Sequence, residues 1–326
     1  MDLIVCTVIS FLITVITGIL FIPLLSKIKA RQTILFYVKE HECKNGTPTM
    51  GGLFFVSAIT IVYAFLGEKS GIATVSLVIA LGFFAIGFLD DFIKIKNSNN
   101  QGLRPYQKIV FQLLISLLAG FFVIKNGLTQ FYLPFFGKNI DLGLFSMPFV
   151  ALIFIAVTNC VNLTDGLDGL AGSVSIVYFI GMAVLLFLQK VFFGEIYPLF
   201  EEVDGVINLC AISSSALMGF LCFNTNKAKV FMGDTGSLAL GGLIGGVTVF
   251  TGNALFLPII GIPFVFSGLS VIIQVAYFKK TGKRFFLMAP YHHHLQQKGL
   301  TEGKIAYLYT VVSVLATAFC LIPFAF

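Results

Sequence analysis

Apolar runs of about 17–22 residues recur along the whole 326-residue chain. An α-helix needs about 20 apolar residues to cross the hydrocarbon core of a bilayer, so each run is long enough to span it. The composition agrees, because 57% of the residues are hydrophobic and only 11% are charged. A soluble domain is nearer to about half apolar and a quarter charged. The sequence therefore predicts an all-α integral membrane protein.

Ten spans are expected, within a single polytopic membrane domain covering residues 1–326. The first run lacks a basic segment and a small-residue cleavage site, so it is expected to be a retained helix. Proline and glycine interrupt the ninth run at Pro258, Gly261 and Pro263 and predict a kinked or broken helix there. The expected spans are 3–25, 49–66, 72–89, 108–124, 147–163, 172–189, 206–223, 236–251, 255–277 and 305–323.

The loops between these spans divide into two sets that differ in charge. The segments 26–48, 90–108, 164–171, 224–235 and 278–304 contain 17 of the 21 Lys and Arg residues, and the other loops contain 4. Cytoplasmic loops are rich in Lys and Arg, so the first set is predicted to be cytoplasmic and both termini external. The formal net charge of +6 is then a sorting signal, and no nucleic-acid partner is expected. The external stretch 126–146 has glycine and proline around short aromatic runs and predicts a small β-hairpin.

Five aspartates stand at the edges of apolar runs on the predicted cytoplasmic side: Asp90, Asp91, Asp165, Asp168 and Asp234. A carboxylate near bilayer depth costs about 2.5–3.5 kcal/mol on insertion scales, so such residues usually have a function. Mg²⁺ takes carboxylate, phosphate and water oxygens as ligands. The position of these aspartates on one face predicts a cytoplasmic active-site cleft that binds a metal ion and phosphate.

Asp90 and Asp91 end the third run, in the segment Asp90-Asp91-Phe92-Ile93-Lys94. Neighbouring helical side chains point about 100° apart, so both carboxylates are not expected to chelate one ion ideally. One is expected to face a metal ion or nucleophile while Lys94 holds the other. The alternative is an acidic pair at a helix end that reaches water.

Two glycine-rich segments offer further carboxylates. Asp165 and Asp168 each precede a glycine after the fifth run, close to Asn162, in a pattern that suits ligand binding or an ordinary Asp-Gly turn. Asp234 lies in Gly-Asp-Thr-Gly-Ser (233–237), which also resembles an aspartic-protease turn or a helix cap. It is the preferred predicted ligand of Mg²⁺.

A histidine triplet, His292, His293 and His294, lies in the last and most basic cytoplasmic loop. Consecutive side chains rarely converge on one ion, so zinc is not favoured. Phosphate contact is the functional interpretation, and a solvated polar loop is the alternative.

Five segments occur in the order GTPTMGG (46–52), DDFIK (90–94), NLTDGLDGLAG (162–172), FMGDTGSLALGG (231–242) and APYHHHLQQKG (289–299). Together they resemble the bacterial phospho-N-acetylmuramoyl-pentapeptide transferases, the translocase I enzymes of peptidoglycan synthesis. The resemblance covers essentially the whole chain. It implies transfer of phospho-N-acetylmuramoyl-pentapeptide from its UDP-linked form to undecaprenyl phosphate, giving lipid I and UMP, with Mg²⁺ as cofactor. It also implies ten transmembrane helices in the bacterial plasma membrane and, often, a homodimer.

The resemblance also implies roles for individual residues. Asp234 is the expected metal ligand. The chain departs from the family in the last loop, where Leu295 and Gln296 replace the usual aromatic residue and glutamate. The predicted catalytic residues are Asp90, Asp91, Asp234, His293 and His294. The predicted substrate-binding residues are Lys44, Thr49, Lys94, Asn162, Asp165, Asp168, Phe231 and His292.

Two alternatives remain for the function. A related polyprenyl-phosphate transferase using UDP-N-acetylglucosamine would share the aspartate segments. A lipid transporter or flippase would be expected to carry ionisable residues in mid-span, whereas this chain keeps its charges at span ends.

Overall fold

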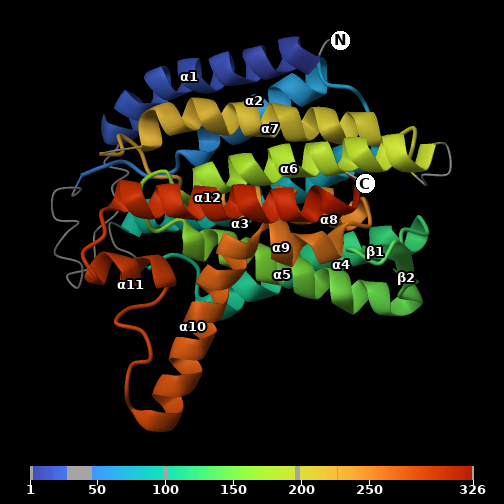
Figure 1. Ribbon diagram of the computed structural model, residues 1–326. Helices are drawn as coiled ribbons and strands as arrows, with labels where there is room; N and C mark the ends of the chain where they lie inside the picture. The colour runs from blue at the N-terminus through green and yellow to red at the C-terminus, as the bar shows by residue number, and fades with distance from the viewer. Residues whose placement is uncertain (1–2, 28–45, 98–100, 195–198, 226, 325–326) are drawn as a thin grey trace.

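The computed structural model describes residues 3–27, 46–97, 101–194, 199–225 and 227–324. The chain folds into a bundle of helices with one small antiparallel hairpin (Figure 1). The helices are α1 (Leu3–Lys27), α2 (Gly52–Phe65), α3 (Gly71–Asn97), α4 (Pro105–Lys125), α5 (Ser146–Thr164), α6 (Leu170–Phe193), α7 (Val203–Asn224), α8 (Gly233–Phe250), α9 (Leu257–Ile260), α10 (Ile262–Thr281), α11 (Tyr291–Gln297) and α12 (Glu302–Leu321), and the strands are β1 (Gln130–Leu133) and β2 (Lys138–Asp141).

The predicted all-α membrane class is confirmed. Among the described residues, eight helices are long and apolar enough to cross a membrane: α1, α3, α4, α5, α6, α7, α10 and α12. Two further predicted spans correspond to α2, an apolar helix of 14 residues, and to α8, which has 18. The ninth predicted span divides at Gly261 into α9 and α10, as its proline and glycine content predicts. Ten crossings and their orientation remain a prediction.

Helix α8 forms the centre of the bundle, and every residue from Thr235 to Phe250 is buried. It packs mainly against α3 and α5, and also against α2. Glycine permits this close approach. A Cβ at Gly87 of α3 would overlap the Asp234 carbonyl, and a Cβ at Gly241 would lie 2.5 Å from the Thr158 Cα of α5. The ends of α3 and α8 are therefore held together at backbone distance.

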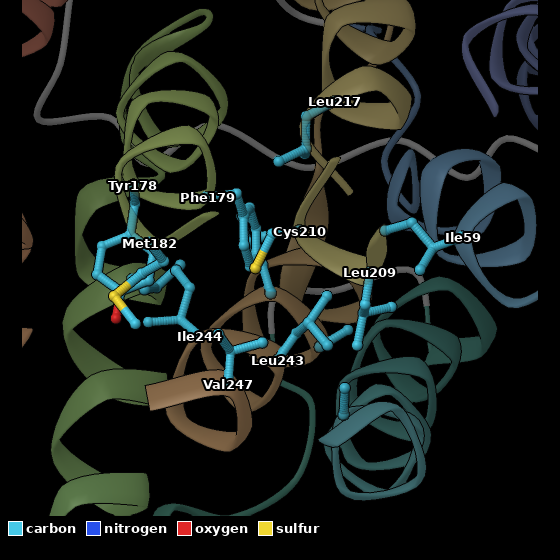
Figure 2. Packing of buried hydrophobic residues seen from close by; sticks show 14 of the residues in the cluster. Ile59, Tyr178, Phe179, Met182, Leu209, Cys210, Leu217, Leu243, Ile244 and Val247 are labelled. Carbon is cyan, nitrogen blue, oxygen red and sulfur yellow. The ribbon is translucent and has the colours of Figure 1, made fainter. Parts of the chain in front are cut away.

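A second part of the core lies where α6, α7 and α8 meet beside α2. Figure 2 shows Tyr178 and Met182 of α6 on one side of this cluster and Ile59 of α2 on the other, with Cys210 and Val247 between them. All five side chains are buried. Hydrophobicity does not drive helices together inside lipid, so close packing of this kind must hold them.

The predicted hairpin is confirmed in the stretch 126–146. β1 pairs with β2 in antiparallel register, with Gln130 opposite Asp141 and Leu133 opposite Lys138. Phe131 points inward and packs edge-on against Phe149, with ring centroids 5.0 Å apart. The hairpin lies at the end of the bundle where α1 begins and α12 ends, while α11 lies at the opposite end (Figure 1). The hairpin, from a loop predicted to be external, and α11, from a loop predicted to be cytoplasmic, thus lie at opposite ends of the bundle.

Helix α1 contacts the bundle through a narrow stripe of small residues. Cys6, Ser10, Thr14 and Gly18 recur every fourth residue and are buried, mainly against α7. The Ser10 hydroxyl donates a hydrogen bond to the Ile212 carbonyl at 3.0 Å. Most other α1 side chains are apolar and exposed. A four-residue spacing of small residues lets helix backbones approach closely within lipid.

Candidate active site

Three carboxylates from two helices meet at the end of the bundle. Asp90 and Asp91 lie in the last turns of α3, and Asp234 lies in the first turn of α8. One ligand oxygen from each lies within 4.8 Å of the others. The Asp90 and Asp91 side chains are buried, and the Asp234 side chain is 15% exposed. The three carboxylates, which come from segments about 140 residues apart in the sequence, therefore form one cluster.

Asp91 caps the start of α8. The backbone N–H and the hydroxyl of Thr235 both donate hydrogen bonds to its Oδ2, at 2.8 and 2.7 Å. Gly233 precedes this turn with φ +73°, a left-handed conformation that favours glycine, and a Cβ there would lie 2.5 Å from the same oxygen. A carboxylate at a helix N-terminus satisfies free N–H groups and interacts favourably with the helix dipole. The Oδ2 atom of Asp91 thus stabilises the start of α8.

Lys94 lies among all three carboxylates. Its Nζ is 2.5 Å from Asp90 Oδ2, 3.6 Å from Asp91 Oδ1 and 3.1 Å from Asp234 Oδ2. Lys94 thus holds Asp90 most closely, as expected, and it also contacts Asp91 and Asp234. Residues three and four apart share a helix face, which lets Lys94 reach both aspartates.

Lys108 is a site residue that the sequence argument counted only as a loop charge. It lies one turn inside α4, and its Nζ is 2.8 Å from Asp234 Oδ2. Pro105 occupies the first turn of α4, which is a common helix start. The proline therefore indicates from the sequence that α4 begins before Lys108. A lysine inside an apolar helix needs an anionic partner, so Lys108 could have been predicted as a site residue.

Asp234 is bound on both oxygens. Asn162 of α5 donates one amide hydrogen bond to Asp234 Oδ1 at 2.6 Å and another to Ser237 Oγ at 2.8 Å. Burial by itself would raise the pKa of Asp234, but the charges of Lys108 and Lys94 outweigh it and hold this pKa well below its usual range. The Asp234 carboxylate is therefore ionised throughout the neutral range.

Asp165 and Asp168 differ in their surroundings although both precede glycine. Asp165 follows the last residue of α5. Burial, and then the negative charges of Asp234 and Asp91, raise its pKa well above the usual range. Asp168 instead accepts a hydrogen bond from the Ala228 N–H at 2.9 Å, which joins its turn to the loop before α8. Contact between Asp168 and substrate stays a prediction.

The histidine triplet lies within the short helix α11, where each ring has different surroundings. His292 is fully buried against Gly166, in the turn that follows α5. His293 Nδ1 lies 2.7 Å from Gln296 Oε1, so a neutral amide orients this ring at the position where a glutamate was expected. His294 Nδ1 accepts a hydrogen bond from the Leu287 N–H at 3.1 Å. Burial, followed by the charge of Lys298, lowers the pKa of His294, which agrees with an unprotonated acceptor nitrogen.

The segment before α2 pairs with the segment before α8. The Phe231 N–H donates to the Pro48 carbonyl at 2.8 Å, and the Gly51 N–H donates to the Phe231 carbonyl at 2.8 Å. Thr49 is buried beside Gly233, so it lies at the carboxylate cluster, whereas Phe231 is held there through its backbone. Lys44, the remaining predicted substrate-binding residue, lies outside the described residues.

The chemistry of the cluster fits a hard divalent cation. Asp90, Asp91 and Asp234 offer only oxygen ligands, and Mg²⁺ is usually held by one or two carboxylates together with phosphate oxygens and water. The Lys94 ammonium already lies among these oxygens, so the space between them suits positive charge. Lysines beside such a cluster also suit phosphate groups. The fold and the site together define a membrane-embedded enzyme of the phosphoryl-transfer type.

Comparison with known proteins agrees with this class. Residues 72–252 match the family model of glycosyl transferase family 4, and residues 44–56 match signature 1 of the phospho-N-acetylmuramoyl-pentapeptide-transferases. The chain belongs to the phospho-N-acetylmuramoyl-pentapeptide-transferase family. It is 43% identical to the protein of that name from Clostridium perfringens (strain 13 / Type A), over 98% of this chain and 96% of the relative. It is 41% identical to that of Clostridioides difficile (strain 630), over 94% of this chain and 92% of the relative.

Proposed function

We propose that this chain transfers phospho-N-acetylmuramoyl-pentapeptide from its UDP-linked form to undecaprenyl phosphate, giving lipid I and UMP. One observation carries the proposal: Asp90, Asp91 and Asp234 converge with Lys94 and Lys108 at one end of a helical bundle. Such a position serves a reaction between a water-soluble nucleotide sugar and a lipid-borne phosphate. The near full-length similarity to relatives of that name supports the same donor and acceptor.

Asp234 is the proposed Mg²⁺ ligand, with Asp90 and Asp91 beside it. When bound, the ion would neutralise negative charge on the phosphates and on departing UMP. Lys94 and Lys108 would bind phosphate oxygens beside Asp234, where their ammonium groups lie 3.1 and 2.8 Å from its Oδ2. Asn162 would keep the Asp234 carboxylate oriented through its hydrogen bond at 2.6 Å.

We infer that the transfer is a direct displacement. An oxygen of undecaprenyl phosphate forms a bond to the sugar-linked phosphorus, and the bond from that phosphorus to UMP breaks, with UMP keeping the electron pair. The attacking phosphate is mostly ionised at neutral pH, because its second pKa is about 6, so a strong general base is not required. Asp91 Oδ2 already accepts two hydrogen bonds, and Asp90 Oδ2 is paired with Lys94. These contacts disfavour a carboxylate nucleophile.

The proposal also places the site on the cytoplasmic face of the bacterial plasma membrane, in a single domain covering the whole chain. The excess of Lys and Arg in the sequence segments that contain the aspartates and their neighbouring loops supports this orientation. A homodimer is proposed from the family resemblance, and the mass of the detergent-solubilised protein tests it.

The test of the activity is UMP release by the purified protein with Mg²⁺ and undecaprenyl phosphate. UDP-N-acetylmuramoyl-pentapeptide and UDP-N-acetylglucosamine are supplied as donors in parallel. We expect UMP from the first donor alone, no UMP in EDTA, and recovery when Mg²⁺ is restored. Release from the second donor alone would assign the chain to the related sugar transferases. Release from neither donor by folded protein would favour a transporter.

Two further measurements test the mechanism. Direct displacement predicts no phosphorylated protein after incubation with the UDP-linked donor alone, and isolation of such a species would contradict it. The metal assignment predicts that Asp234→Asn loses nearly all activity, and near-normal turnover by this variant would overturn it.

A further inference from the structure

The described part of the connection before α4, residues 101–104, contacts Asp90 of α3. The Leu103 backbone N–H donates a hydrogen bond to Asp90 Oδ1 at 2.9 Å. The Asp90 side chain is only 4% exposed. The other oxygen, Oδ2, lies 2.5 Å from Lys94 Nζ. One oxygen of this carboxylate therefore accepts a hydrogen bond from the connection, and the other forms an ion pair with Lys94 of α3.

Gly102 leaves no room for a side chain at this point. A Cβ would lie 2.5 Å from Asp90 Oδ1, 2.6 Å from Cγ and 2.7 Å from Oδ2. These distances are below those that real Cβ atoms show. The φ of Gly102 lies outside the left-handed region, so its backbone conformation is open to other residues. The Asp90 carboxylate, rather than the backbone, is what excludes a side chain here.

Movement of Asp90 would be transmitted to the rest of the site. Asp90 Oδ2 is the nearest carboxylate oxygen to Lys94 Nζ, and Lys94 in turn lies 3.1 Å from Asp234 Oδ2. The same connection leads directly into α4, which carries Lys108. Residues 101–104 thus contact the partner of one lysine at Asp234 and precede the helix that carries the other.

We propose that Gly102 is a positioning residue of this enzyme. Its lack of a side chain lets the Leu103 N–H reach Asp90, which fixes the carboxylate that orients Lys94. In this role Asp90 acts as an anchored partner of Lys94. The inference rests on the proposed transferase function. In it, Gly102 affects turnover through Asp90 and Lys94 and has no direct contact with substrate.

The test compares Gly102→Ala with Gly303→Ala. Gly303 lies in the first turn of α12, and a Cβ there would have no neighbour within 4 Å, so it is a matched control. The alanine at 102 should displace the carboxylate, which is the mobile end of a short side chain, and leave the fold intact. We expect kcat to fall about 10- to 100-fold, since a displacement near 1 Å can cost about that much. KM for the UDP-linked donor should stay within about threefold, and the melting midpoint within about 3 °C.

Several outcomes would overturn the inference. Gly102→Ala with kcat within twofold of the parent would show that Asp90 needs no such anchoring. A raised KM with unchanged kcat would mean that the connection binds substrate, and an equal loss in Gly303→Ala or a large drop in melting midpoint would mean a structural effect. Failure of the proposed function is separately visible, because the unmodified protein would then release no UMP.

Discussion

At the scale of single residues, Asp234 is the most heavily engaged group of the site. Two ammonium groups approach its Oδ2 and one amide approaches its Oδ1. Because the lysine charges hold the pKa of this carboxyl well below its usual range, acidification to mildly acidic pH leaves it ionised. The raised pKa of Asp165 has the opposite consequence, because this carboxyl takes up a proton more readily than an exposed one.

Replacing Lys108 should impair turnover more than stability. Lys108→Met keeps most of the aliphatic length of the side chain but removes the charge 2.8 Å from Asp234. We expect kcat to fall about 10²- to 10³-fold, which is the usual effect of removing one fixed charge-stabilising group. Steady-state UMP release measures it. Lys125→Met, at the exposed far end of the same helix, should retain activity, and equal activity of both variants would contradict the assigned role.

At the scale of helices, the site depends on the contact between α3 and α8. Gly87 lies one turn before Asp90 and Asp91 and faces the backbone of Asp234 and Thr235. No other residue has a side chain small enough for this approach, because a Cβ would overlap the Asp234 carbonyl. The glycine therefore sets the distance between the two groups of carboxylates.

The variant Gly87→Ala should separate these helices. Overpacking of this kind costs about 1–3 kcal/mol, occasionally more, and we expect a melting midpoint several degrees lower together with at least a tenfold loss of kcat. Thermal unfolding and UMP release measure the two effects. Gly82→Ala in the same helix is the control, because its Cβ would meet only the Ile115 side chain, at 3.0 Å or more. Equal behaviour of both variants would refute the importance of the close contact.

The positions of most helices could be predicted from the sequence. Apolar length located the helices, and Gly261 located the break between α9 and α10, because these depend on local composition. Contacts made by the backbone could not be predicted. The Leu103 N–H on Asp90 and the Thr235 N–H on Asp91 depend on where distant segments meet. Lys108 was missed for a related reason, since the predicted span began at the residue where α4 is already one turn long.

At the scale of the whole molecule, the two ends of the bundle differ in character. The carboxylate cluster and α11 lie at one end, and the hairpin lies at the other. In the sequence, most Lys and Arg residues fall in the loops predicted to be cytoplasmic. We predict that an impermeant maleimide labels Lys138→Cys on intact cells and labels Lys283→Cys only after permeabilisation. Both positions are exposed, and Cys43 and Cys222 would first be replaced by serine. The reverse labelling would invert the proposed orientation.

The contrast between α1 and α8 bears on how the protein is made. Ser10 of α1 binds a carbonyl 202 positions later in the chain, so the first helix must reside in lipid long before α7 is synthesised. Helix α1 is suited to being in the bilayer before its partners, because its exposed side chains are mostly apolar. The Thr14 hydroxyl also donates its hydrogen bond within the helix, to the Ser10 carbonyl. The glycine-rich α8 has no lipid-facing surface, but α2, α3 and α5, against which it packs, all precede it. Helix α8, which is the least suited to remain alone in the bilayer, is thus synthesised after the helices that cover it.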